Sequence, residues 1–285
     1  MQLGYNTNGF AHHRLVDAIE IVGRLGYRCV AITLDHCALD PWGKDLPAEI
    51  REVKAKLTEF GLSCVIETGA RFLLDPWRKH EPTMLSHGAE NRRHRLEFLK
   101  RAVDIAVDLN AAAVSFWSGG NPEDVSDENA WQRLVQGCRE VARYAGERGM
   151  PLGFEPEPGM FIETLAGYER LKSHVASPEF KLTLDIGHAL ITEDICVDAC
   201  IRRYSEDIVN IHLEDMKKTR HDHLFFGDGE IDFKSVFQAI ADIRYTGPIC
   251  VELSRHSHQA VETARLARYF LSNLNLPLTA DTDPP

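Results

Sequence analysis

Four acidic or histidine side chains close short apolar segments of the chain: Glu155, Asp185, His212 and Glu252. Each segment is typical of a buried strand. Because the carboxyl ends of parallel strands meet at one edge of a sheet, the four side chains are expected to lie together where ligands bind. Three carboxylates and one imidazole suit a single divalent ion, namely Mn²⁺, Mg²⁺, Co²⁺ or Zn²⁺. One such strand end alone could be an ordinary polar residue, but four unpaired charges beside a core would be costly.

Alternating strands and helices must position these side chains. Apolar and β-branched segments predict strands at 2–6, 28–34, 63–67, 112–117, 151–155, 181–185, 208–212 and 248–252. Helical periodicity predicts helices at 14–25, 47–60, 90–109, 127–148, 164–175, 194–204, 233–243 and 258–274, with Asp127 and Asp232 as N-caps. This alternation requires parallel strands joined by right-handed crossovers. Eight such units predict a closed (β/α)₈ TIM barrel.

The chain shows no linker and no shift in composition, so a single domain is expected over residues 1–275. Residues 276–285 are rich in Pro, Thr and Asp and are expected to form a flexible tail. A doubly wound open sheet is the alternative fold. The first predicted strand, however, is followed by Asn6-Thr7-Asn8-Gly9, which is not a glycine-rich phosphate loop.

The composition narrows the possible partners. Lys and Arg total 32 and Asp and Glu total 43, giving a net charge of −11 that disfavours nucleic acid. No apolar run is long enough to span a membrane, and residues 1–5 show no start of a signal peptide. The seven cysteines form no Cys-x-x-Cys motif and indicate free thiols in a reducing compartment. A cytoplasmic protein without nucleic-acid or membrane partners is therefore expected.

Residues 68–88 form a long segment without helical or strand periodicity, which indicates either a lid over a polar ligand or a surface excursion. Trp117, Phe116 and Trp77 could supply an apolar face for a sugar ring or carbon chain, although Phe116 could equally belong to the core. Arg255 could bind an anionic group of a substrate.

Several motifs together resemble the xylose isomerase-like TIM barrel superfamily, which includes sugar and sugar-phosphate isomerases and epimerases, inosose and dehydroshikimate dehydratases, and endonuclease IV-type enzymes. The resemblance covers nearly the whole predicted barrel. The motifs are Phe154-Glu155-Pro156-Glu157-Pro158-Gly159, Asp185-Ile186-Gly187-His188, His212-Leu213-Glu214-Asp215, Gly227-Asp228-Gly229-Glu230-Ile231-Asp232 and Val251-Glu252-Leu253.

The resemblance implies one divalent metal ion held by Glu155, Asp185, His212 and Glu252. It also implies an isomerase or epimerase of a sugar, keto-polyol or cyclitol, which removes a proton next to a carbonyl through a metal-stabilised enediolate. Glu155 and Glu252 are then expected to be catalytic as base and acid as well as metal ligands. Glu157 rivals Glu155 as a ligand, since residues two apart on a strand face the same way.

The expected substrate-binding residues are His188, Trp117, Arg255 and His223. His188 could hydrogen-bond a substrate hydroxyl or play a structural role. Asp215 could orient a ligand, bind a second cation or act as a cap. Since related barrels are often dimers or tetramers, the resemblance also allows a homo-oligomer.

Three alternative functions remain open. A dehydratase acting on an inosose or dehydroshikimate would use the same metal and bases. An endonuclease IV-type phosphodiesterase would need further histidines near the third and fourth strands, but those strands end in Glu67-Thr68 and in residues 115–118, which supply none. The segment 221–223, His-Asp-His, resembles an Asp-x-His pair of that branch and favours it. A non-catalytic barrel would have no need of the four charged strand ends.

Overall fold

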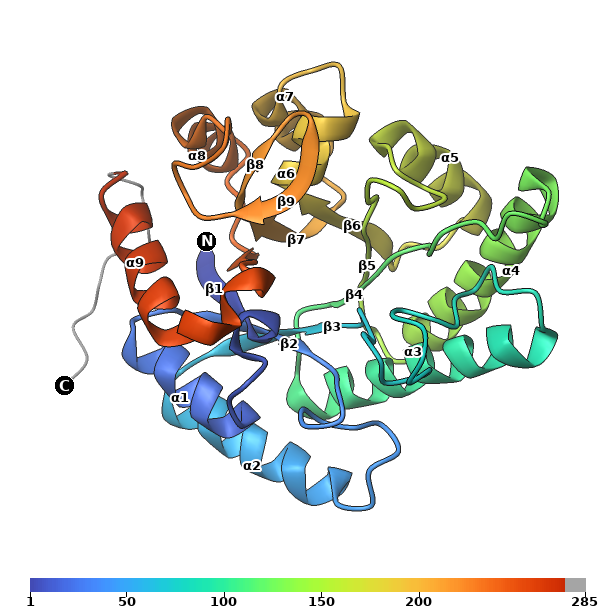
Figure 1. Cartoon of the computed structure of the whole chain (residues 1–285), viewed down its shortest axis with the longest axis horizontal. Coiled ribbons are helices and arrows are strands. Elements are labelled where there is room, and N and C mark those ends of the chain that lie inside the picture. The colour runs from blue at the N-terminus through green and yellow to red at the C-terminus, as the bar shows by residue number, and fades with distance from the viewer. Residues whose placement is uncertain (275–285) are drawn as a thin grey trace.

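The structure is a computed structural model that describes residues 1–274, so residue 275 and the predicted tail lie outside the described part of the chain. Eight parallel strands close into a barrel in the order β1-β10-β7-β6-β5-β4-β3-β2, and helices surround it (Figure 1). This confirms the predicted (β/α)₈ fold and the single domain. The barrel strands are β1 (Gln2–Asn6), β2 (Cys29–Thr33), β3 (Ser63–Glu67), β4 (Val114–Phe116), β5 (Leu152–Phe154), β6 (Phe180–Asp185), β7 (Ile208–Leu213) and β10 (Pro248–Val251).

Most helices lie within a few residues of their predicted positions. Ser126, not Asp127, accepts the capping hydrogen bond of α4, whereas Asp232 caps α8 as predicted. No helix within residues 1–274 has the length and apolar character needed to cross a membrane. The helices are α1 (Leu15–Arg24), α2 (Leu46–Glu59), α3 (Ala89–Leu109), α4 (Asp127–Gly146), α5 (Leu165–Val175), α6 (Ile186–Thr192), α7 (Val197–Arg203), α8 (Phe233–Asp242) and α9 (Ala260–Ser272), with the 3₁₀ turns η1 (Thr7–Phe10) and η2 (Ser254–Gln259).

A short helix and a two-stranded hairpin were missed by the sequence patterns. The helix predicted at 194–204 is preceded by a second short helix, α6, which starts directly after β6 because Asp185 caps it. A hairpin of β8 (Asp215–Lys217) and β9 (Arg220–Leu224) follows β7. Its strands carry mainly charged and polar side chains, so they lack the apolar alternation that identifies a strand.

The layer between strands and helices contains an aromatic cluster. Phe180 is fully buried, and its ring lies 5.5 Å from that of Phe154 and 6.0 Å from that of Tyr168.

Inside the barrel, Gly4 permits close packing, since a Cβ there would lie 2.8 Å from the Cys250 sulfur. All seven cysteines are free, and five of them are buried, as expected for a chain without disulfides.

We expect Phe180→Ala to lower the free energy of unfolding by about 3–5 kcal/mol, because it removes a fully buried ring from the aromatic cluster. Phe72→Ala is the control: that side chain is 46% exposed, and its loss should cost less than about 1 kcal/mol. Urea titration followed by circular dichroism measures both changes. Equal losses in the two variants would contradict the assignment of Phe180 to the core.

Candidate metal centre and active site

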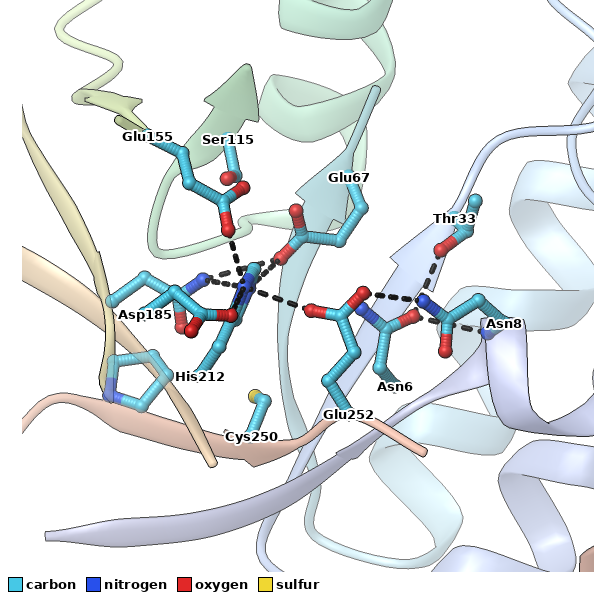
Figure 2. Close-up of polar contacts among 12 residues, drawn as sticks. Asn6, Asn8, Thr33, Glu67, Ser115, Glu155, Asp185, His212, Cys250 and Glu252 are labelled. Atoms are coloured by element: carbon cyan, nitrogen blue, oxygen red, sulfur yellow. Dashed lines mark hydrogen bonds and ion pairs between the residues drawn. The ribbon is translucent and has the colours of Figure 1, made fainter. Parts of the chain in front are cut away.

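The four predicted side chains meet at the carboxyl-terminal mouth of the barrel. One donor atom from each of Glu155, Asp185, His212 and Glu252 lies within 4.8 Å of the others. His212 Nδ1 is 2.9 Å from Glu252 Oε2, 3.1 Å from Glu155 Oε1 and 3.9 Å from Asp185 Oδ2 (Figure 2). Three carboxylates therefore surround one imidazole nitrogen, which is an arrangement that a divalent cation can bind.

The two oxygens of Asp185 have different environments. Oδ1 accepts a hydrogen bond of 2.7 Å from the backbone N–H of His188, which fixes the carboxylate at the start of α6. Oδ2 is buried and accepts no hydrogen bond from the described residues. A buried acceptor without a partner is costly, and a cation bound to Oδ2 would remove that cost.

Glu252 is positioned by the first βα turn. Asn8 Nδ2 donates a hydrogen bond of 2.7 Å to Glu252 Oε1, which leaves Oε2 facing His212. Asn6 in turn fixes this turn, because its side-chain oxygen accepts hydrogen bonds from the Asn8 N–H and the Thr33 hydroxyl (Figure 2). Residues 6–9, which do not form a phosphate-binding loop, thus position the Glu252 carboxylate of the candidate centre.

Glu67 belongs to the site although it was not among the predicted site residues. Its Oε1 lies 2.9 Å from His212 Nε2 and accepts a hydrogen bond of 3.1 Å from Asn210 Nδ2. The available signal was the same as for the four predicted ligands, since Glu67 is a carboxylate that ends an apolar strand. In the sequence, Glu67 served only to show that the third strand does not end in the histidine that an endonuclease IV-type enzyme would need.

Burial and neighbouring charges shift the pKa values of the centre in different directions. Burial raises the pKa of Glu155 well above its usual value. Burial would also raise the pKa of Glu252, but the facing His212 holds it far below the usual range. Burial would lower the pKa of His212, but the carboxylates of Glu155, Glu67 and Glu252 raise it well above 6.5. In the absence of a cation, Glu155 therefore favours its protonated form and Glu252 its ionised form.

A cavity of about 410 Å³ opens above this centre. All four residues predicted to bind substrate line it: His188, Trp117, Arg255 and His223. Glu157 also lines the cavity, and burial raises its pKa to about 8, but it lies outside the four-ligand group. A volume of this size suits a small, polar molecule.

A second group of histidines lies beside the centre. Ring nitrogens of His188, His221 and His223 lie within 4.8 Å of one another, with His188 Nε2 and His221 Nε2 2.9 Å apart. This nitrogen-rich group could hold a second cation. Asp222, between the two hairpin histidines, is instead paired with Arg220 and, at 2.6 Å, with Arg255. The His-Asp-His segment therefore presents its histidines, and not its aspartate, to the group.

Residues 68–88 form one wall of the cavity through Thr68, Gly69, Arg71, Lys79 and His80. Arginine side chains fasten the segment to the helices behind it: Arg95 donates to the Thr68 carbonyl at 2.9 Å, and Arg133 to the Leu85 carbonyl at 3.0 Å. The interpretation as a plain surface excursion is therefore wrong.

The suggested aromatic wall is only partly right. Trp117 lines the cavity, and the buried Arg95 guanidinium lies 4.8 Å from the centre of its ring. Trp77 is 89% exposed and does not line the cavity. The prediction for Trp77 failed because the sequence does not show on which side of the loop a side chain lies. Phe116 is 1% exposed and belongs to the core, since its ring packs against Phe154.

Asp215 has a structural role. It accepts backbone hydrogen bonds from Met216, Gly227, Gly229 and Ile231, at 2.8 to 3.2 Å. Gly229 is required there, since a Cβ would lie 2.2 Å from Asp215 Oδ1. Asp215 thus organises the loop between β9 and α8, as the capping alternative suggested.

The closed barrel and the cluster of candidate ligands at its carboxyl-terminal mouth define a TIM-barrel protein with a candidate active site. The chain belongs to the xylose isomerase-like TIM barrel family, whose model matches residues 19–274. It is similar to inosose dehydratase from Lacticaseibacillus casei, with 29% identity over 56% of this chain and 59% of that protein. Inosose dehydratase from Klebsiella pneumoniae strain 342 is 31% identical over 47% of this chain and 50% of that protein. The chain thus spans half to three-fifths of the length of these relatives.

Solved structures share the fold over almost the whole chain. The 3-keto-D-glucoside 4-epimerase YcjR from E. coli has a TM-score of 0.78 and 17% identity, covering 96% of this chain and 99% of that one. D-allulose 3-epimerase from Methylomonas sp., in complex with D-allulose, has a TM-score of 0.75 and 20% identity, covering 96% of both chains. At these identities the similarity establishes the fold alone.

We predict that Mn²⁺ binding releases about one proton from His212, because its raised pKa keeps Nδ1 protonated in the metal-free protein. A rising pH removes the competing proton, so the Kd should fall about tenfold per pH unit while the pH is below the raised pKa of His212, and level off above that pKa. Isothermal titration calorimetry in two buffers of different ionisation enthalpy measures the released proton. A binding enthalpy that does not depend on the buffer would contradict the prediction.

We predict that Glu155→Gln weakens Mn²⁺ binding by more than about 100-fold, since it removes a charged group from the four-ligand cluster. Glu157→Gln is the matched control, and it should change the affinity by less than about threefold because Glu157 lies outside the cluster. Mn²⁺ titration with detection of the free ion by electron paramagnetic resonance measures both. The reverse ranking would mean that Glu157 supplies the ligand.

Proposed function

We propose that this protein is a divalent-metal-dependent isomerase or epimerase of a sugar, keto-polyol or cyclitol. The observation that carries the proposal is the cluster of three carboxylates and one imidazole nitrogen within 4.8 Å, beneath a cavity of about 410 Å³. Isomerases and epimerases of this kind need a polarised carbonyl and a base beside it, and such a centre can supply both.

The proposed ligands of one Mn²⁺, Mg²⁺, Co²⁺ or Zn²⁺ ion are Glu155, Asp185, His212 and Glu252. Their chemistry fits a cation, because the buried Asp185 Oδ2 accepts no hydrogen bond from the described residues and His212 Nδ1 faces three carboxylates. When bound, the ion would act as a Lewis acid that stabilises the negative charge developing next to the carbon that loses its proton.

Glu252 and Glu155 are the proposed acid–base pair. Because its pKa is held low, Glu252 is ionised, as a group that accepts a proton from the carbon next to a carbonyl must be. Glu155 lines the same cavity from the end of β5, where it can return a proton to another position or face. Asn8 keeps Glu252 directed to the reacting side by its 2.7 Å hydrogen bond.

The cavity walls provide the proposed substrate contacts. The Trp117 ring offers a flat apolar surface, and His188 and His223 offer ring nitrogens to hydroxyl groups. Arg255 has a side chain that is 59% exposed and anchored by Asp222, so it lies where substrate enters. A small-molecule polyol or sugar is therefore the proposed partner.

A metal-dependent dehydratase of a cyclic keto-polyol is the second candidate. It is favoured by the curated relatives, which are named inosose dehydratases and are 29% and 31% identical over the matched segments. Both reactions begin with removal of a proton next to a carbonyl, so the same carboxylates serve both. The endonuclease alternative is less favoured, because β3 and β4 bring Glu67 and Ser115 to the cavity in place of histidines. The non-catalytic alternative is less favoured, because it gives the cluster of three carboxylates and one imidazole no role.

We predict that the Mn²⁺-loaded protein catalyses uptake of solvent deuterium at the carbon next to the carbonyl of a ketose or inosose. Glu252→Gln should lower the rate of deuterium uptake by about 10²–10⁴-fold, since it removes the proposed base. Glu147→Gln, whose side chain is 57% exposed at the end of α4, is the control and should leave the rate unchanged. Proton NMR in D₂O follows the exchange and identifies the product.

An isomeric product would assign an isomerase or epimerase, and loss of water would assign the dehydratase. Normal turnover by both Glu252→Gln and Glu155→Gln would overturn the proposed acid–base pair.

A further inference from the structure

The two nitrogens of His212 face different partners. Nδ1 faces Glu252 Oε2 at 2.9 Å and Glu155 Oε1 at 3.1 Å, whereas Nε2 faces Glu67 Oε1 at 2.9 Å. A neutral imidazole carries one proton, and only the nitrogen without that proton can bind a cation. The position of this proton therefore decides whether His212 can serve as a ligand.

Glu67 reaches His212 across the interior of the barrel. In the strand order, β3 and β7 are separated by three strands on either side, so they lie on opposite walls. Glu67 is 6% exposed, and its Oε1 also accepts a hydrogen bond from Asn210 Nδ2. Asn210 precedes His212 by two residues on β7, so both side chains point inward to the same oxygen.

We propose that Glu67 is a positioning residue that fixes His212 as the Nε2–H tautomer and so presents the Nδ1 lone pair to the cation. This inference rests on the proposed metal centre. An ionised carboxylate can only accept hydrogen bonds, so Nε2 must be the donor in this contact. Among residues 1–274, Glu67 supplies the one oxygen within hydrogen-bond distance of Nε2. The amide nitrogen of Asn210 also lies 3.0 Å from Nε2, and it donates a hydrogen bond of 3.1 Å to the same Glu67 oxygen. Without it, the ring can rotate or place its proton on Nδ1.

The first test compares the affinity for Mn²⁺ in three variants of the full chain, by the same electron paramagnetic resonance titration. Glu67→Leu has a similar shape but no acceptor, so we expect the Kd to rise about 10- to 100-fold. Glu67→Gln keeps an acceptor oxygen and should recover most of this loss. Glu147→Gln is the control, since its side chain is 57% exposed at the end of α4, and it should leave the Kd unchanged.

The second test observes the tautomer directly. In protein loaded with diamagnetic Mg²⁺ and labelled with ¹⁵N-histidine, the His212 ring should show an exchange-protected proton on Nε2 in long-range NMR spectra. The signal is assigned by its absence in His212→Gln. Glu67→Leu should lose the protection, and Glu67→Gln should keep it. A purely structural role of Glu67 would change the melting temperature but not the tautomer.

The outcomes separate this inference from the proposed function. A wild-type protein that binds no Mn²⁺ would overturn the metal centre and this inference with it. Tight binding by the wild type with an unchanged affinity and tautomer in Glu67→Leu would overturn the inference alone. Thermal unfolding of the metal-free variants checks that they fold. If Glu67→Leu does not fold, the test rests on Glu67→Gln. Loss of the Nε2–H protection in that variant would then overturn the inference.

Discussion

The crowding of negative charge around His212 is the constraint on which the rest of the site depends. Removing several carboxylates from water costs several kcal/mol for each group that lacks a partner. The chain offsets part of this cost with the Asn8 amide, the backbone N–H of His188 and His212 itself. The buried Asp185 Oδ2 still accepts no hydrogen bond from the described residues, so a cation is the partner that this arrangement favours.

Strand register brings the charges together. Asp185 on β6 is paired with His212 on β7, and Cys250, two residues before Glu252, is paired with His212 on its other side. The register thus places Asp185 level with His212 and Glu252 two residues further along its strand, at the mouth of the barrel. Glu67 completes the set from the opposite wall, and a small interior makes that contact possible.

Much of the cavity wall comes from segments other than the barrel strands. Residues 68–88, the β8–β9 hairpin and η2 line it, together with Trp117, Glu157 and His188. Ion pairs such as Asp222–Arg255 join the hairpin to η2, and arginine contacts to backbone carbonyls hold residues 68–88 in place. The barrel strands thus carry the four-residue cluster, whereas loops and turns form much of the cavity around it.

The sequence by itself determined the barrel and the four converging strand ends, because apolar periodicity and terminal charge are local properties of each segment. It could not identify Glu67 as the partner of His212, since that contact joins residues 145 positions apart. It could not show that Trp77 faces away from the cavity, or that Asp222 pairs with arginines while its neighbours turn inward. Loop direction and cross-barrel contacts follow from packing of distant segments, and only the tertiary structure decided them.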